Sequence, residues 1–96
     1  MKIKGMAKSG NVYLDDVPLF AEKSQAYLNL SPEGFSWGDE SSGSAQLAVA
    51  ILLEHYGAPI EAIEEHQEFL RRFIAPLPKG KDFEIEIHPW KPLSLN

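Results

Sequence analysis

The stretch Ala45-Gln46-Leu47-Ala48-Val49-Ala50-Ile51-Leu52-Leu53 decides the fold. Apart from Gln46, every residue in it is apolar, so apolar side chains would point in all directions around a helix. A helix of that kind is central and covered on most sides. Residues 42–44, Ser-Gly-Ser, cap a helix acceptably, and Gly57 favours the left-handed conformation that ends one. We therefore predict a central helix over about 44–56.

A second helix follows, and prolines mark both of its ends. Pro59 suits the first helical position and Pro76 stops a helix, which predicts a helix over about 59–75. Apolar residues at helical spacing indicate the face that turns toward the core: Ile60, Ile63, Leu70, Phe73 and Ile74. Four glutamates indicate a solvated face: Glu61, Glu64, Glu65 and Glu68. Across both helices we expect near-complete burial of Leu47, Ala48, Ile51, Leu52, Ile63, Leu70 and Phe73.

The clearest strand is Phe83-Glu84-Ile85-Glu86-Ile87-His88, in which apolar and polar residues alternate. Alternation of this kind indicates a strand with one face on the core and one in water. The first 20 residues also have β character, with turn residues at 9–11 and at Asp15-Asp16. Pro18 lacks a main-chain donor and confines its strand to an edge. We expect this N-terminal hairpin to pair antiparallel with the strand at about 83–88.

These elements predict an α+β fold. A small antiparallel sheet, made of the N-terminal hairpin and the C-terminal strand at about 83–88, packs on the two helices at about 44–56 and 59–75. We expect a single domain over residues 1–96, with a frayed tail at 89–96.

The connection over residues 21–43 is long for a small domain. Residues 21–30 allow a short helical turn. Two large aromatic residues, Phe35 and Trp37, lie in a loop rich in glycine and serine. Loops of this length are usually functional or packed by their own side chains. We expect both aromatic side chains to pack on the core.

Composition excludes several classes of function. The chain has no cysteine, which excludes disulfides, thiolate catalysis and cysteine-based metal sites. Its 14 acidic and 9 basic residues give a net charge of −5, which argues against a phosphate-binding surface for nucleic acid. No apolar run approaches the roughly 20 residues that a membrane span needs, and no signal peptide is evident. We expect a cytoplasmic protein that binds neither nucleic acid nor membrane.

Two motifs resemble a family of small, uncharacterised bacterial and bacteriophage domains. The motifs are Gly34-Phe35-Ser36-Trp37-Gly38 and Gly43-Ser44-Ala45-Gln46-Leu47-Ala48-Val49-Ala50-Ile51-Leu52. The matching stretch runs from Ser31 to Leu53, and the pattern from Val12 to Leu19 is also similar. The family signature reads GFxWGYxGSGPAQLALAIL. The chain departs from it where Asp39-Glu40-Ser41-Ser42 replaces a neutral turn and where Ser44 replaces proline. The resemblance implies a fold and a setting in bacteria, phage or mobile elements, but no reaction.

No catalytic, cofactor-binding or metal-binding residues are predicted. The Gly-x-Ser-x-Gly pattern around Ser36 lacks the buried strand that precedes a nucleophile elbow, so we expect its glycines to permit a tight aromatic turn. The serines before the central helix are expected to cap it with their hydroxyl groups. The three histidines are far apart in sequence, and we interpret them as lone surface residues: His55, His66 and His88.

Protein binding is therefore the function we predict, in a regulatory factor such as an inhibitor of a host or defence protein. The predicted docking site is an acidic strip on the last strand that ends in a tryptophan: Glu84, Glu86, His88 and Trp90. The second candidate docking site consists of the two carboxylates of the variant turn, Asp39 and Glu40. Burial of Trp90 in the core and its exposure at an interface are both left open. The alternative is a small ligand-binding or enzymatic domain with a pocket at the start of the 44–56 helix.

Overall fold

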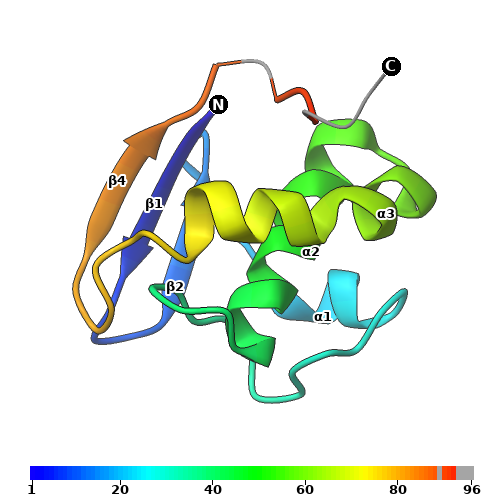
Figure 1. Cartoon of the computed structure of the whole chain (residues 1–96). Helices are drawn as coiled ribbons and strands as arrows, with labels where there is room; N and C mark the ends of the chain where they lie inside the picture. The colour runs from blue at the N-terminus through cyan, green and yellow to red at the C-terminus, as the bar shows by residue number, and fades with distance from the viewer. Residues whose placement is uncertain (89, 93–96) are drawn as a thin grey trace.

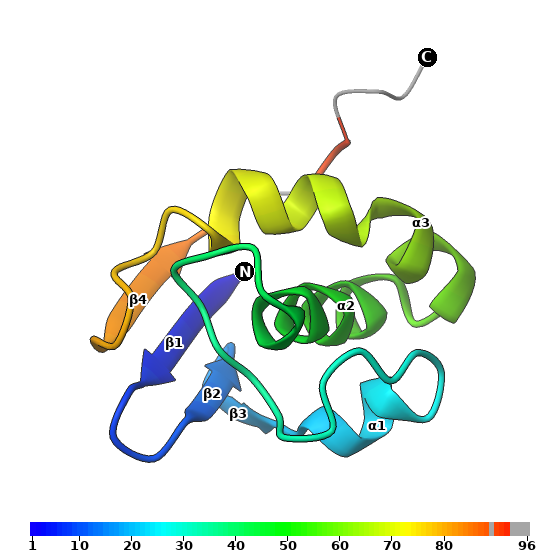
Figure 2. The same ribbon diagram turned by 60° about the horizontal axis from the view of Figure 1, so that its bottom comes forward.

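A four-stranded antiparallel sheet and a layer of helices build the domain (Figures 1 and 2). The computed structural model describes residues 1–88 and 90–92. The α+β fold predicted from the sequence is confirmed. Of the tail at 89–96 that was expected to fray, only residues 90–92 are described, and Trp90 is packed into the core.

The sheet has the strand order β3-β2-β1-β4 and contains strands from both ends of the chain. The strands are β1 (Lys2–Met6), β2 (Asn11–Leu14), β3 (Val17–Leu19) and β4 (Phe83–Glu86). β1 lies between the hairpin partner β2 and the C-terminal β4, and both pairings are antiparallel as predicted. β4 is two residues shorter than expected, although the Ile87 amide still donates to the Met1 carbonyl oxygen at 2.8 Å. The alternation holds, with Phe83 and Ile87 buried beneath the sheet.

The turn between β2 and β3 sets the register of these two strands and so the edge that Pro18 faces. Asp15 and Asp16 have φ angles of 50° and 67°, the left-handed pair of a two-residue hairpin loop. Leu14 and Val17 flank this loop and form the hydrogen-bonded pair of the turn, so the next pair, Tyr13 and Pro18, is a non-hydrogen-bonded one. The missing N–H of Pro18 therefore lies on the free edge of β3, and the proline costs the sheet no internal hydrogen bond.

The helical layer consists of four elements: α1 (Ala21–Gln25), α2 (Ser42–Tyr56), α3 (Pro59–Phe69) and the π-helical turn η1 (Leu70–Ile74). α2 covers the predicted central helix, and Gly57 ends it with φ of 67° while its N–H donates to the Leu53 carbonyl oxygen at 2.8 Å. The predicted second helix is continuous over 59–74 but widens at η1, where the Ala75 N–H donates to the Leu70 carbonyl oxygen. Among the described residues, no helix has the length and apolar character that crossing a membrane requires.

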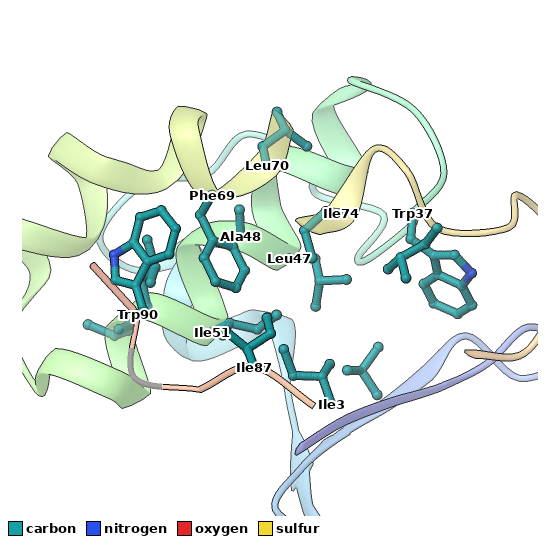
Figure 3. Close-up of a cluster of buried hydrophobic side chains, with 14 of the residues drawn as sticks. Ile3, Trp37, Leu47, Ala48, Ile51, Phe69, Leu70, Ile74, Ile87 and Trp90 are labelled. Atoms are coloured by element: carbon teal, nitrogen blue, oxygen red, sulfur yellow. The ribbon is translucent and has the colours of Figure 1, made fainter. Parts of the chain in front are cut away.

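The core lies between α2, the sheet and the α3–η1 segment (Figure 3). The predicted burial of the α2 residues is confirmed, since each is fully buried: Leu47, Ala48, Ile51 and Leu52. Leu70 is also buried as predicted.

The expected inner face of α3 was partly wrong. Ile60 is 67 % exposed, and Ile63 and Phe73 are only half-buried. Ile74 is buried as predicted, and Ala62, His66 and Phe69 turn inward in place of Ile60 and Ile63. The wide turn at η1 adds a residue to the helical repeat after Phe69, so Ile74 is buried more completely than Phe73, which packs at the edge of the core. His66, interpreted as a surface residue, is buried with its Nδ1 atom 2.6 Å from the Ile63 carbonyl oxygen.

Gln46, the polar residue of the apolar stretch, fastens the connection between α1 and α2. Its Oε1 atom accepts the main-chain N–H groups of Leu30 and Ser31 at 2.7 and 3.0 Å. Its Nε2 group donates to Ser24 Oγ at 2.8 Å and to the Leu28 carbonyl oxygen at 3.0 Å. The amide is fully buried and uses all these partners, so the start of the long connection is held to the central helix.

Candidate functional site

The acidic strip predicted on the last strand lies on the open face of the sheet. Its side chains are exposed there, as the alternation indicated: Glu84, Glu86 and His88. The register places Lys4 opposite Glu84 and Lys2 opposite Glu86. Opposite charges on paired strands attract each other. This face is therefore mixed in charge, which weakens it as an acidic docking surface.

Trp90 is not an exposed end to that strip, because only 5 % of it is accessible. Its ring packs edge-on against Phe69, with 5.0 Å between the ring centroids. Its Nε1 group donates to Glu65 Oε1 at 2.8 Å. Of the two alternatives left open for Trp90, the structure shows burial, so the residue stabilises the fold.

Glu65 has a role that the sequence did not indicate. It was assigned to a solvated face, yet its Oε1 atom accepts hydrogen bonds from Trp90 and from the hydroxyl group of Tyr56. Burial, followed by the hydrogen bond to Glu65, raises the pKa of Tyr56 to about 12. These three side chains join α2, α3 and the C-terminal segment.

Asp39 of the variant turn is occupied within the chain. Its Oδ1 atom accepts from the Ser41 hydroxyl at 2.6 Å, the Ser44 hydroxyl at 2.8 Å and the Ser41 N–H at 3.1 Å. Lys79 Nζ lies 2.9 Å from Oδ2. The Ser41 hydroxyl, the Lys79 ammonium group and the Ser44 hydroxyl hold the pKa of Asp39 far below its usual range. Asp39 thus organises the turn, while the neighbouring Glu40 is exposed.

The expected capping of the central helix by serine hydroxyls was wrong. Ser41 is the N-cap residue of α2, and its side chain makes no capping hydrogen bond. The Ser41 and Ser44 hydroxyls donate to Asp39 instead. Hydrogen bonds to a carboxylate are strong, and these two hold the hydroxyl groups toward Asp39 and not toward the main-chain N–H groups at the start of the helix.

Ser36, the centre of the Gly-x-Ser-x-Gly pattern, lies in the same cluster. Its Oγ atom is 3.1 Å from Ser41 Oγ and 3.4 Å from Ser44 Oγ. The flanking Gly34 and Gly38 have φ angles of 108° and 87°, which fits the predicted tight turn. Trp37 is buried as expected, whereas Phe35 is half-buried. Among the described residues, no group of three or more histidine, aspartate or glutamate side chains is placed to hold a metal ion.

Phe35 borders open hollows on several sides. One, of about 300 Å³, lies against the start of α2 and includes Ser31, Ser36 and Gly43. Another, of about 240 Å³, lies between Phe35, Trp37 and Lys79. The first occupies the place where the alternative prediction put a ligand pocket.

The largest exposed apolar residues lie elsewhere, and two of them share one segment. Val17 is 64 % exposed and Phe20 is 67 % exposed, on either side of Pro18 and Leu19. The segment forms the edge strand β3 and leads directly into α1, along the lower side of the molecule in Figure 2. One feature of the sequence indicated this exposure. Pro18 marks a sheet edge, where less of the protein covers an apolar segment.

Hollows flank this apolar segment. The larger, of about 380 Å³, lies between residues 18–22, residues 9–13 and residues 33–35, so Phe20 and Phe35 both line it. Glu22 and Glu33 also line it, and no lysine or arginine does. The smaller, of about 170 Å³, runs from Val17 to the ion pair of Lys23 and Glu54. We call residues 17–20, together with the larger hollow, the Phe20 surface.

Comparison with known proteins gives a family and no activity. A family model described as a family of unknown function, DUF6166, matches residues 3–90. The chain belongs to this family. The match includes the edge strand β3 as well as the loop around Phe35. No curated protein and no solved structure matches the chain.

Proposed function

We propose that this DUF6166 domain is a protein-binding factor and not an enzyme, and that it docks through the Phe20 surface. The supporting observation is the exposure of Val17 and Phe20 beside the hollow that Phe20 shares with Phe35. Exposed aromatic residues next to a concave surface are typical of the anchors of protein interfaces. A regulatory role in phage or mobile elements, including inhibition of a host or defence protein, is part of this proposal and rests on the sequence resemblance.

The non-enzymatic part of the proposal has support in the surroundings of Ser36. The hydrogen-bond partners of its hydroxyl group are the hydroxyls of Ser41 and Ser44. Neither of these groups is a general base of the kind that activates a serine nucleophile. A fluorophosphonate probe should therefore leave the native protein unlabelled, and labelling that disappears in Ser36→Ala would contradict the proposal.

The docking site is tested by affinity capture from cells that encode the protein. The wild-type domain is compared with Val17→Ser/Phe20→Ser and with Ile60→Ser, because Ile60 is as exposed as Phe20 but lies on α3. We expect a partner that the wild type and Ile60→Ser retain and that the double variant loses. Circular dichroism checks that all three are folded.

Two results would contradict the proposed docking site on the Phe20 surface. Loss of the partner in Glu84→Lys/Glu86→Lys, with retention in the Val17/Phe20 variant, would return the docking site to the open face of the sheet. Equal capture by every variant, or no specific partner, would contradict protein binding through either face.

A second candidate function is binding of a small molecule in the hollow at the start of α2. The observation in its favour is the 300 Å³ space that Ser31, Ser36 and Gly43 border. A ligand that binds the folded state raises its melting temperature. A thermal-shift screen with metal ions, nucleotides and acyl compounds tests this, and a shift at sub-millimolar ligand that Gly43→Ala removes would favour it over protein binding.

A further inference from the structure

The hollow of the Phe20 surface carries unpaired negative charge. Glu22 and Glu33 are both exposed, and neither has an ion pair or hydrogen bond through its side chain among the described residues. Several other carboxylates in the described part of the chain are paired with cations, as in Lys2–Asp16, Lys23–Glu54 and Lys79–Asp39. The two glutamates of this hollow therefore remain available to a cation from outside.

Apolar and aromatic side chains form one part of the wall between these carboxylates, and Ser9 and Asn11 lie in another part. Tyr13, Phe20 and Phe35 line the hollow together with Pro18 and Leu19. A lysine or arginine side chain suits such a place, because its aliphatic stem packs on apolar surface while its charged end stays at the rim. Its cation is also attracted to the faces of aromatic rings.

These features select one class of partner. Phosphate groups of nucleic acids or lipids would be repelled by Glu22 and Glu33, in a chain whose net charge is −5. A second copy of the chain is a poor match, since it carries the same net charge of −5 and Lys2, Lys23 and Lys79 already form ion pairs within their own molecule. We infer that the Phe20 surface binds a basic segment of a partner protein, with a lysine or arginine side chain lying between Glu22 and Glu33 against Phe20 and Phe35. This inference rests on the proposed function.

The edge strand beside the hollow favours recognition by side chains. Strand addition needs free main-chain donors and acceptors along a sheet edge. Pro18 is at the middle of β3 and leaves the free edge without a donor there. The partner segment is therefore held by its cation and its apolar side chains, not by extension of the sheet.

A selection from a random library of 12-residue peptides tests the inference. We expect peptides selected on the wild-type domain to carry lysine or arginine next to an apolar residue. Glu22→Gln/Glu33→Gln should weaken their binding about tenfold at low salt, since two partly exposed charge pairs are lost. The difference between the two proteins should shrink at high salt. NMR shifts on binding should fall in residues 9–13, 18–22 and 33–35.

The matched control is Glu40→Gln/Glu64→Gln, which removes the same charge from exposed positions outside the hollow. It should bind the peptides like the wild type. An equal loss in this control would show that net charge alone acts and would overturn the inference. The inference would also be overturned if the selected peptides were acidic or neutral. It would be overturned equally if the binding of basic peptides did not depend on Glu22 and Glu33.

Failure of this inference is distinguishable from failure of the proposed function. If Val17→Ser/Phe20→Ser loses a captured partner while Glu22→Gln/Glu33→Gln keeps it, the proposed docking surface is supported and the inference of a basic partner segment is wrong. If sedimentation shows a wild-type dimer that Phe20→Ser dissociates, the occupant is a second copy and the inference is overturned.

Discussion

The indole Nε1 of Trp37 donates a hydrogen bond to the main-chain carbonyl oxygen of Lys81 at 2.9 Å, across 44 positions of sequence. The same ring packs edge-on against Phe83, with 4.9 Å between the ring centroids. Trp37 thus ties the loop around Phe35 to the beginning of β4. The loop owes its position to this contact at one end and to Gln46 at the other.

Trp37→Phe should lower the free energy of unfolding by about 1–3 kcal/mol, because it removes the indole donor and part of a buried ring. Urea denaturation measures the change. Lys81→Ala is the control, since the acceptor is a main-chain atom and the lysine side chain is exposed. A Trp37→Phe protein as stable as the wild type would show that this contact does not hold the loop.

Asp39 should make the domain sensitive to acid. Its pKa in the folded protein lies below the unfolded value of 3.8, so folding favours the ionised form. The stabilisation is present above the unfolded pKa and is lost as the pH falls below it. Between about pH 5 and 2 the melting temperature of the wild type should therefore fall more steeply than that of Asp39→Asn.

The neighbouring substitution Glu40→Gln is the control for Asp39, because Glu40 is exposed. It should leave the wild-type acid dependence unchanged. Parallel curves for the wild type and Asp39→Asn would mean that the serine and lysine contacts contribute little to stability.

Tyr56 should produce the opposite dependence at high pH. Its pKa is raised from 10.0 to about 12 in the folded protein, so the folded state holds the phenol proton more tightly than the unfolded state. The stabilisation is complete below pH 10.0 and declines as the pH rises toward 12. Urea midpoints between these pH values should decline more for the wild type than for Tyr56→Phe, and Tyr27→Phe, at an exposed position, should behave like the wild type. An identical decline in Tyr56→Phe would exclude the hydrogen bond to Glu65 as a source of stability.

The elements that local pattern determines were predictable from the sequence. Residues 45–53 could only form a covered helix, and the alternation from Phe83 onward placed the two glutamates of β4 in water. The inner face of the second helix was harder to predict, and for Phe73 the reason is the π-helical turn at Leu70–Ile74, which breaks the 3.6-residue repeat on which that prediction depended. No local feature of the sequence indicated that turn.

The candidate sites depended on contacts between distant residues. Trp90 is buried against Phe69, and Glu65, 25 positions earlier, accepts the hydrogen bond of its indole N–H. Asp39 is not a free carboxylate, because Lys79, Ser41 and Ser44 bind it. Phe20 is exposed at the junction between the edge strand β3 and the start of α1. Sequence pattern marks such residues as apolar or charged but does not show which neighbours the fold brings to them.

Two glycines of the loop around Phe35 provide a matched test of how closely it packs. Gly34 and Gly38 have φ angles of 108° and 87°, so alanine is strained at both positions. A Cβ atom at Gly34 would meet nothing within 4 Å, whereas one at Gly38 would lie 2.6 Å from the Cα atom of Lys79. Main-chain atoms cannot move aside as a flexible side chain does, and the Gly38 N–H is itself bound to the Ile74 carbonyl oxygen at 3.0 Å.

We therefore expect Gly34→Ala to lower the free energy of unfolding by about 1–2 kcal/mol through backbone strain alone. Gly38→Ala should cost about 1–3 kcal/mol more, since it adds a clash inside a packed contact. Urea denaturation of both variants gives the difference, and Lys79→Ala in the Gly38→Ala background should not restore stability, because the obstructing atoms include the Lys79 main chain. Equal costs at the two glycines would mean that the loop can lift away from Lys79, and the hollow between Phe35, Trp37 and Lys79 would then change shape with it.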